Sequence, residues 1–246
     1  MTTPVLLLIP GMFNTRAIWD PVIAALRASG RAPDIRVADV LTQESIAAMA
    51  ADAWALVADL PPATRLVVCG FSMGGYVALE LLAAHPGQVH GLAMVDSAAA
   101  VESAESLVVR NKTIAALERN FERTVAGIIP FSLHPDSLAD TALVDGMRAM
   151  MHSVGAQAAI RQTRAIMARR DHRPLLADLR IAALVVCGRE DRVTPPAASE
   201  ELHRLLPHAP LEWIEQAGHQ TPLEQPAVVA RHLLALIDRA NPSPQP

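Results

Sequence analysis

The sequence lacks any apolar segment that approaches the roughly 20 residues needed to span a membrane. Its first apolar run, Val5–Ile9, has no basic residue before it and stops at Pro10 and Gly11. That run is typical of a strand and unlike the core of a secretory signal peptide. These absences predict a cytoplasmic protein with no membrane partner.

Clusters of basic residues are also missing. The chain has 21 lysine and arginine residues against 25 aspartate and glutamate residues, a net charge of −4 and a pI near 6.1. The arginines are spread among acidic residues, so no basic surface for nucleic acid is expected. The composition favours a soluble protein that acts on small molecules and does not indicate an oligomeric state.

Cysteine is scarce, and cofactor motifs are absent from the sequence. The two cysteines, Cys69 and Cys187, each close an apolar run just before a glycine, which predicts buried free thiols rather than a disulfide. We find no zinc-type Cys/His spacing, no phosphate-binding glycine loop and no internal repeat. We therefore expect neither a metal nor a cofactor.

What the sequence does contain is an alternation of strand and helix patterns. A chain of 246 residues that is 51% hydrophobic can form one large core. The alternation predicts an α/β fold with a mostly parallel sheet and helices on both faces. The expected strands are Val5–Ile9, Ile35–Val40, Arg65–Cys69, Val89–Val95, Ala182–Cys187 and Leu211–Ile214, and the expected helices are Ala17–Ala28, Ser45–Leu60, Met73–His85, Ala197–Leu206 and Ala227–Arg239.

The alternation stops between about residues 100 and 173. Only helical patterns remain there, and we expect Gly127, Pro130, Pro135 and Gly155 to break them. The segment reads as an insertion into the α/β core. At the other end, Asn241–Pro246 is a short proline-rich tail that we expect to be frayed.

The segment GFSMGG at positions 70–75 places Ser72 between an apolar strand candidate and a helical pattern. Glycine at 70 and 74 removes side chains that would clash where the helix crosses the strand. A serine at such a sharp turn is exposed above the sheet, as a nucleophile must be. A structural turn serine is the alternative, and the strand and helix on either side favour the nucleophile.

Asp191 and His219 also follow apolar strand candidates. Asp191 lies three residues after Gly188, and His219 follows Leu211–Ile214, so the chain order is serine, acid, histidine. A serine hydroxyl needs a base to act as a nucleophile at neutral pH, and imidazole titrates in that range. A carboxylate on the other ring nitrogen holds the tautomer and stabilises the imidazolium.

Three motifs together resemble the signature segments of the α/β-hydrolase superfamily, in its serine hydrolase and esterase branch. They are GFSMGG, Gly-x-x-Asp-x-Val-x-Pro from Gly188, and Gly-His-x-x-x-x-Glu-x-Pro from Gly218. The resemblance extends from Val5 to the last helix. It implies a sheet of about six strands without the leading antiparallel hairpin of many members, a core formed by residues 1–99 and 174–246, and a helical cap formed by residues 100–173.

The resemblance also implies roles for individual residues. Ser72 is the expected nucleophile, His219 the base and Asp191 the acid. Glu190 is adjacent, but the family spacing favours Asp191. Asp96, after the strand Val89–Val95, is the position from which some members supply the acid, and its alternative role is to cap the following segment.

An oxyanion intermediate needs two backbone N–H donors. We expect one from Met73, at the start of a helix, and the other from Met12, in the loop after the first strand. The family usually has His-Gly where this chain has Pro10-Gly11. Backbone donation does not need that histidine, and Pro10 can restrain the loop instead.

In the expected cap, Ile128, Ile129, Phe131, Met147, Met150 and Met151 are candidates for a substrate pocket, although such residues more often serve packing. The favoured function is a cofactor-independent carboxylesterase that cleaves a small or medium ester through an acyl-enzyme. The same site suits a lactone, a thioester, a carbon–carbon bond beside a ketone, or transfer to another acceptor. A ligand-binding receptor with residual hydrolysis, and cofactor-free oxygen chemistry with His219 as base, are further alternatives.

Overall fold

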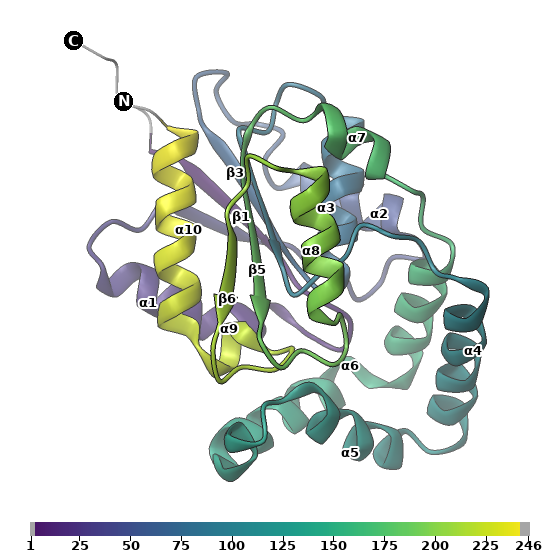
Figure 1. Ribbon diagram of the computed structural model, residues 1–246. Coiled ribbons are helices and arrows are strands. Elements are labelled where there is room, and N and C mark those ends of the chain that lie inside the picture. Colours follow the sequence, from purple (N-terminus) through teal and green to yellow (C-terminus); the bar gives the residue numbers. More distant parts are fainter. Residues whose placement is uncertain (1–2, 242–246) are drawn as a thin grey trace.

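The computed structural model describes residues 3–241, and its centre is one six-stranded sheet. The strand order is β2-β1-β3-β4-β5-β6, and every neighbouring pair is parallel. Helices cover both faces (Figure 1). The prediction of a parallel sheet of about six strands is confirmed, and the described residues contain no leading hairpin. Apart from Asn241, the predicted tail lies outside the described residues.

The sheet and the helices packed on its two faces, which we call the body, follow the predicted alternation of strands and helices. Its strands are β1 (Val5–Ile9), β2 (Asp34–Val37), β3 (Leu66–Phe71), β4 (Gly91–Val95), β5 (Ala182–Gly188) and β6 (Leu211–Ile214). Its helices are the 3-10 helix η1 (Arg16–Trp19), α1 (Asp20–Ala28), α2 (Ile46–Ala55), α3 (Met73–Ala84), α8 (Pro196–Leu205), α9 (Thr221–Glu224) and α10 (Pro226–Ala240). The observed β2 and α2 are shorter than the predicted strand and helix.

Both faces of the sheet are buried, as the first strand illustrates. Successive side chains of a strand point in opposite directions. Leu6 and Leu8 pack in a cluster with residues of α1 and α10, whereas Val5, Leu7 and Ile9 pack in a second cluster with residues of α2, α3 and α8. A central parallel strand therefore needs apolar residues at every position, which is why these runs are continuous in the sequence.

A helical insertion joins β4 to β5 and consists of α4 (Ala104–Arg119), α5 (Phe121–Ser132), the 3-10 helix η2 (Asp136–Ala139) and α6 (Thr141–Met167), followed by α7 (Arg173–Asp178). In Figure 1 the helices α4, α5 and α6 lie beyond the carboxyl ends of the strands. They share a small apolar cluster of their own, which Phe13 of the body joins. The insertion is thus packed against the edge of the sheet where β3 and β5 end.

Two of the predicted helix breaks in the insertion are wrong. Gly127 and Pro130 both lie inside α5, because the buried side chains of Val125 and Ile129 hold that helix against the insertion's cluster. Pro135, by contrast, follows the end of α5 and precedes η2. Gly155 interrupts α6 with a φ of +74°, which a glycine adopts at little cost.

A buried carboxylate ties the segment after α6 to the body. Glu80 of α3 accepts hydrogen bonds from Arg170 and from His172, whose Nε2 lies 2.7 Å away. The Glu80 side chain is 5% exposed. Burial raises the pKa of Glu80, but the hydrogen bonds from Arg170 and His172 outweigh it and leave the pKa below its usual value. The ionised carboxylate is therefore part of the native packing.

Candidate active site

Ser72 lies at the turn between β3 and α3 in a strained conformation. Its φ is +53°, a region that residues with a side chain rarely adopt. The turn is held on both sides, because the Ser72 N–H donates to Val95 at 2.9 Å and the Ser97 hydroxyl donates to the Ser72 carbonyl at 2.8 Å. A Cβ on Gly70 would overlap the Gly74 carbonyl, so this close crossing requires glycine.

His219 lies in the loop after β6 and reaches Ser72. Its Nε2 is 2.9 Å from the Ser72 Oγ, and its Nδ1 is 2.8 Å from Oδ2 of Asp191. Since Nδ1–H donates to the carboxylate, Nε2 is the acceptor for the serine hydroxyl. His219 is 4% exposed and contacts the ring of Phe71, with 5.3 Å between ring centroids. The arrangement suits removal of the serine proton.

Asp191 is buried in the loop after β5 and is held by several donors. Its Oδ1 accepts the N–H groups of Val193 at 2.7 Å and Thr194 at 3.0 Å, and its Oδ2 accepts the Thr194 hydroxyl at 2.8 Å. Burial raises the pKa of Asp191, but the charge of His219 and the hydrogen bonds from His219 and Thr194 outweigh it and leave the pKa below its usual value. Asp191 is therefore ionised beside the imidazole. The sequence did not point to Thr194.

The two alternative carboxylates, Asp96 and Glu190, form hydrogen bonds to groups other than His219. Asp96 accepts the Gly188 N–H at 2.8 Å and the Thr221 hydroxyl, and Glu190 accepts the Ala217 N–H at 3.3 Å. Burial, followed by the nearby charge of Asp191, raises the pKa of Asp96 well above its usual value. Asp96 thus joins the end of β5 to the start of α9 and does not contact the imidazole.

Asp96, Cys187 and Asp191 also bring three potential metal ligands within 4.8 Å of one another. Their chemistry does not suit a cation, however, because the carboxylate oxygens already accept protein hydrogen bonds. Burial raises the pKa of the Cys187 thiol and, likewise, that of Cys69, so both remain protonated. The two cysteines are free and buried, as predicted.

Within the described part of the chain, the backbone N–H groups of Met12 and Met73 face no acceptor. Both residues line the cavity that contains Ser72, and among residues 3–241 no carbonyl or side chain accepts from either amide. Met73 is the first residue of α3, where backbone N–H groups lack a partner within the helix. The two amides are thus available to an oxygen atom bound beside Ser72.

The loop that carries Met12 is fixed by residues that the sequence did not indicate. The Asn14 side chain donates to the Met12 carbonyl at 2.7 Å. Gln162 of α6, which is completely buried, accepts the Phe13 N–H at 3.1 Å and donates to the Val40 carbonyl at 3.0 Å. Phe13 has a φ of +64°, so the loop is strained and these contacts hold it.

The loop that carries His219 is likewise joined to the insertion. One oxygen of Glu224 accepts the N–H groups of Gly218 and Gln220, and its other oxygen accepts the His134 N–H and the Ser137 hydroxyl. In addition, the backbone N–H of His219 donates to the Ser132 carbonyl at 2.7 Å. The glutamate in the Gly-His-x-x-x-x-Glu motif is therefore a link between the two segments.

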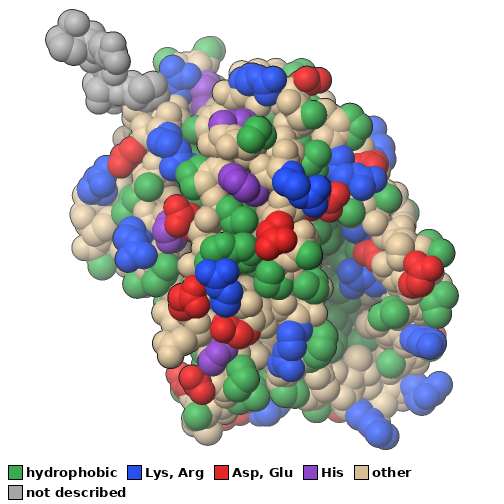
Figure 2. Space-filling view, viewed as in Figure 1, with side chains coloured by type: hydrophobic (Ala, Val, Ile, Leu, Met, Phe, Trp, Pro, Cys, Tyr) green, Lys and Arg blue, Asp and Glu red, His purple; other side chains and the backbone are tan. Residues whose placement is uncertain are grey.

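A cavity of about 220 Å³ extends from Ser72 and His219 beneath the insertion. The space-filling view shows the surface hollowed between the body and α4 (Figure 2). Of the six predicted pocket residues, those that line the cavity are Ile128, Phe131, Met147 and Met151. The other two, Ile129 and Met150, are buried against the insertion's own cluster and against the sheet cluster, because neighbouring positions of a helix point in different directions.

The sequence profile of the alpha/beta hydrolase family matches residues 6–232. The chain belongs to this family. The predicted fold and the resemblance noted in the sequence are thereby confirmed. Within residues 3–241, this alpha/beta hydrolase has no helix that is long and apolar enough to cross a membrane.

Relatives of this alpha/beta hydrolase include esterases. It is 28% identical over 209 residues to the pimeloyl-(acyl-carrier protein) methyl ester esterase of Neisseria meningitidis serogroup B, covering 82% of this chain and 76% of that protein. It is 31% identical over 198 residues to the protein of the same name from Aromatoleum aromaticum, with 71% and 75% covered.

The fold is also that of solved esterases. A thermophilic esterase from Thermogutta terrifontis superposes with a TM-score of 0.85 at 24% identity, covering 97% of this chain and 91% of the other. Neither the family nor the fold identifies the substrate. Its chemical nature is inferred below from the residues that line the cavity.

Proposed function

We propose that this alpha/beta hydrolase is a cofactor-independent carboxylesterase that cleaves a small or medium ester through an acyl-enzyme on Ser72. The continuous contact from Ser72 Oγ to His219 at 2.9 Å and from His219 to Asp191 at 2.8 Å carries the proposal. Such a chain is the arrangement that turns a serine into a nucleophile at neutral pH. Relatives that are named methyl ester esterases support an ester as the substrate.

The residues act in sequence on the ester carbonyl. Ser72 Oγ attacks the carbonyl carbon while its proton passes to Nε2 of His219, and the ionised Asp191 stabilises the imidazolium. The negative carbonyl oxygen of the tetrahedral intermediate accepts the Met12 and Met73 N–H groups. His219 then protonates the departing alcohol, and the acyl group remains on Ser72.

Water completes the cycle by the same route. His219 removes a proton from a water molecule, which attacks the acyl carbon, and the acid leaves as Ser72 recovers its proton. An acceptor other than water would turn hydrolysis into acyl transfer at the same residues. Oxygen chemistry with His219 as base would instead proceed without Ser72.

We further propose that residues 100–173 act as a cap that bounds the substrate. Eight of its residues line the cavity, and the volume of about 220 Å³ is below the roughly 300–1,000 Å³ of pockets for drug-sized ligands. Phe131 and Val193, which are 50% and 39% exposed, line the cavity where it meets the surface. A short acyl chain fits this space better than a long one.

Hydrolysis of p-nitrophenyl esters from acetate to laurate by the wild type and by Ser72→Ala tests the proposal. We expect saturable turnover that is fastest for the short esters and falls by at least about 10³-fold in Ser72→Ala. Ser153→Ala, at an exposed serine of α6, is the matched control and should keep wild-type turnover. Turnover that survives in Ser72→Ala would contradict the acyl-enzyme, and no turnover with any ester would favour the receptor alternative.

A further inference from the structure

The mostly apolar cavity contains one permanently charged side chain. Arg110 of α4 is the one guanidinium or carboxylate among the described residues that line it, and Thr113, one turn further along α4, lines it as well. The side chain of Arg110 is 30% exposed. A guanidinium that is partly withdrawn from water favours a nearby anion.

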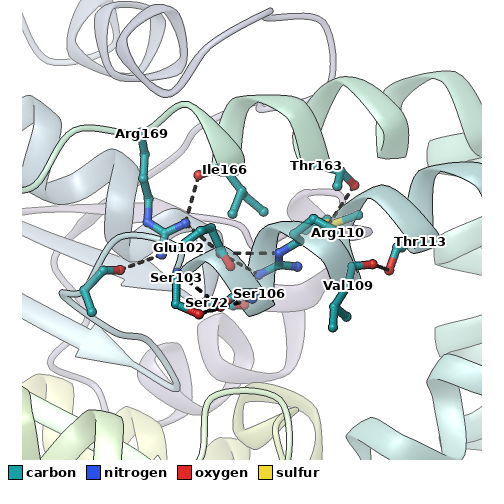
Figure 3. A network of polar contacts seen from close by, with 12 residues as sticks. Ser72, Glu102, Ser103, Ser106, Val109, Arg110, Thr113, Thr163, Ile166 and Arg169 are labelled. Atoms are coloured by element: carbon teal, nitrogen blue, oxygen red, sulfur yellow. Dashed lines mark hydrogen bonds and ion pairs between the residues drawn. The ribbon is translucent and has the colours of Figure 1, made fainter.

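The compensation within the protein is incomplete. A single oxygen of Glu102, Oε1, accepts from Arg110 Nη2 at 3.2 Å and from Arg169 Nη1 at 2.8 Å (Figure 3). Burial raises the pKa of Glu102, but the hydrogen bond from Arg169 and the charges of both arginines outweigh it and leave the pKa below its usual value. One ionised carboxylate thus faces two guanidinium groups, and the cluster keeps a net positive charge.

Of the two arginines beside Glu102, Arg169 is the one that holds the surrounding structure together. It is 6% exposed, lies 4.1 Å above the ring of Tyr76, and donates to the carbonyl groups of Ala100 and Ile166 as well as to Glu102. Glu102 is therefore already paired, and at the shorter distance, without Arg110. The guanidinium of Arg110 is not needed for this contact between Arg169 and Glu102.

Arg110 also has N–H donors that its contact with Glu102 does not use. Its Nε and Nη2 share the single Oε1 of Glu102 at 3.3 and 3.2 Å, and its Nη1 has no acceptor among residues 3–241. Tyr76 lines the same cavity, and burial raises the pKa of its hydroxyl, which therefore stays a donor. Guanidinium and hydroxyl donors together match the two oxygens of a carboxylate.

We propose that the substrate is an ester that carries a carboxylate at the end remote from the bond cleaved, and that Arg110 binds this carboxylate. The inference rests on the proposed function, because it takes the cavity beside Ser72 as the ester site. Arg110 is then a residue that determines specificity. The hydrocarbon between ester and carboxylate lies against the apolar lining, and the small cavity keeps it short.

Matched pairs of anionic and neutral esters test this assignment. The first pair, monomethyl adipate and methyl adipamate, places a carboxylate or its neutral amide isostere on the acyl side. The second pair, the acetate esters of a hydroxycarboxylic acid of similar length and of its amide, places them on the alcohol side. The quantity measured is the ratio of kcat/KM for the anionic ester to that for the neutral one.

We expect the wild type to favour the anionic member of at least one pair. Arg110→Met should lower that ratio by about 10- to 100-fold, since a hydrogen bond to a charged group is lost. Arg119→Met removes the same charge from an exposed position of α4 and should leave the ratio unchanged. A ratio that Arg110→Met leaves unaltered in both pairs would overturn the proposal.

Binding to the inactive Ser72→Ala variant separates this proposal from the esterase reaction. By calorimetry, Ser72→Ala should bind monomethyl adipate or the anionic acetate ester more tightly than the matching amide, and Ser72→Ala/Arg110→Met should lose the preference. If no ester is hydrolysed but the preference is present, the proposed reaction fails and the anion site stands. If neutral esters are hydrolysed and neither pair shows a preference, the anion site fails alone.

Discussion

The Oε1 atom of Gln162 accepts the backbone N–H of Phe13 at 3.1 Å, although 149 residues separate them in the chain. Gln162 belongs to α6 of the helical insertion, and Phe13 follows Met12, whose amide we assign to the oxyanion. The insertion therefore supports the loop that carries the proposed oxyanion donor. An insertion that opened fully as a lid would break this contact and release the strained loop.

The first prediction concerns Gln162. Gln162→Met keeps the side-chain volume but removes both hydrogen bonds, so the Met12 amide loses its fixed position. We expect kcat to fall by about 10- to 100-fold with little change in KM, because the amide stabilises the transition state more than the bound ester. Steady-state kinetics with a short p-nitrophenyl ester measure the two constants.

Gln157→Met, at an exposed position of α6, is the control for this substitution. It should retain wild-type kcat. A purely structural role for Gln162 would lower the melting temperature and leave kcat per folded molecule unchanged, which would refute the positioning role.

The second prediction separates the two buried aspartates. Asp191→Asn removes the carboxylate that orients His219 and should lower kcat by about 10³- to 10⁴-fold. Asp96→Asn should lower kcat by less than about 10-fold, because the side chain of Asp96 is held by Gly188 and Thr221 and does not contact His219. The opposite ranking of the two variants would assign the acid to Asp96.

The third prediction concerns stability and pH through Glu80. The pKa of Glu80 is lower in the folded state, so its stabilising contribution is complete above the unfolded pKa of about 4.3 and is lost as pH falls through the folded value. Glu80→Gln should reduce the free energy of unfolding by about 1–3 kcal/mol at pH 7. Urea unfolding at several pH values should show this difference shrinking below pH 4.3 or so; a difference independent of pH would contradict the account.

The fourth prediction concerns the link through Glu224. In Glu224→Gln an NH₂ group replaces one of two oxygens that each accept two protein hydrogen bonds. Donors then face donors, and we expect a loss of about 2–3 kcal/mol in unfolding free energy together with a lower kcat, because the His219 loop shifts. Glu215→Gln, at an exposed pair with Arg189, is the comparison and should change stability by less than about 0.5 kcal/mol.

The sequence was sufficient for features that are local or periodic. The strand at Leu66–Phe71, the turn at Ser72 and the helix after it all leave marks within a few residues, as do the apolar runs of the other central strands. Gln162 leaves no such mark, since its partners Phe13 and Val40 are distant in the chain. Arg110 is likewise an ordinary helix residue until the fold brings it to the cavity. Thr194 lies only three residues after Asp191, but nothing in the sequence marks its hydroxyl as a donor to that carboxylate.

The insertion was the least predictable region for the same reason. Local propensity placed breaks at Gly127 and Pro130, but burial of Val125 and Ile129 keeps α5 continuous through both. The direction of each side chain then depends on helix packing. That is why Met147 and Met151, four residues apart on one face, line the cavity while Met150 faces the sheet.

If Ser72 is the nucleophile, a reagent that traps an attacking serine covalently must label it. A p-nitrophenyl alkylphosphonate with a short alkyl group mimics the tetrahedral intermediate and leaves a stable phosphonyl group on an attacking serine. We predict one equivalent of p-nitrophenol, complete inactivation, and a mass increase confined to the peptide that contains Ser72. Inactivation with the label on another residue, or an active enzyme that takes no label, would contradict the account.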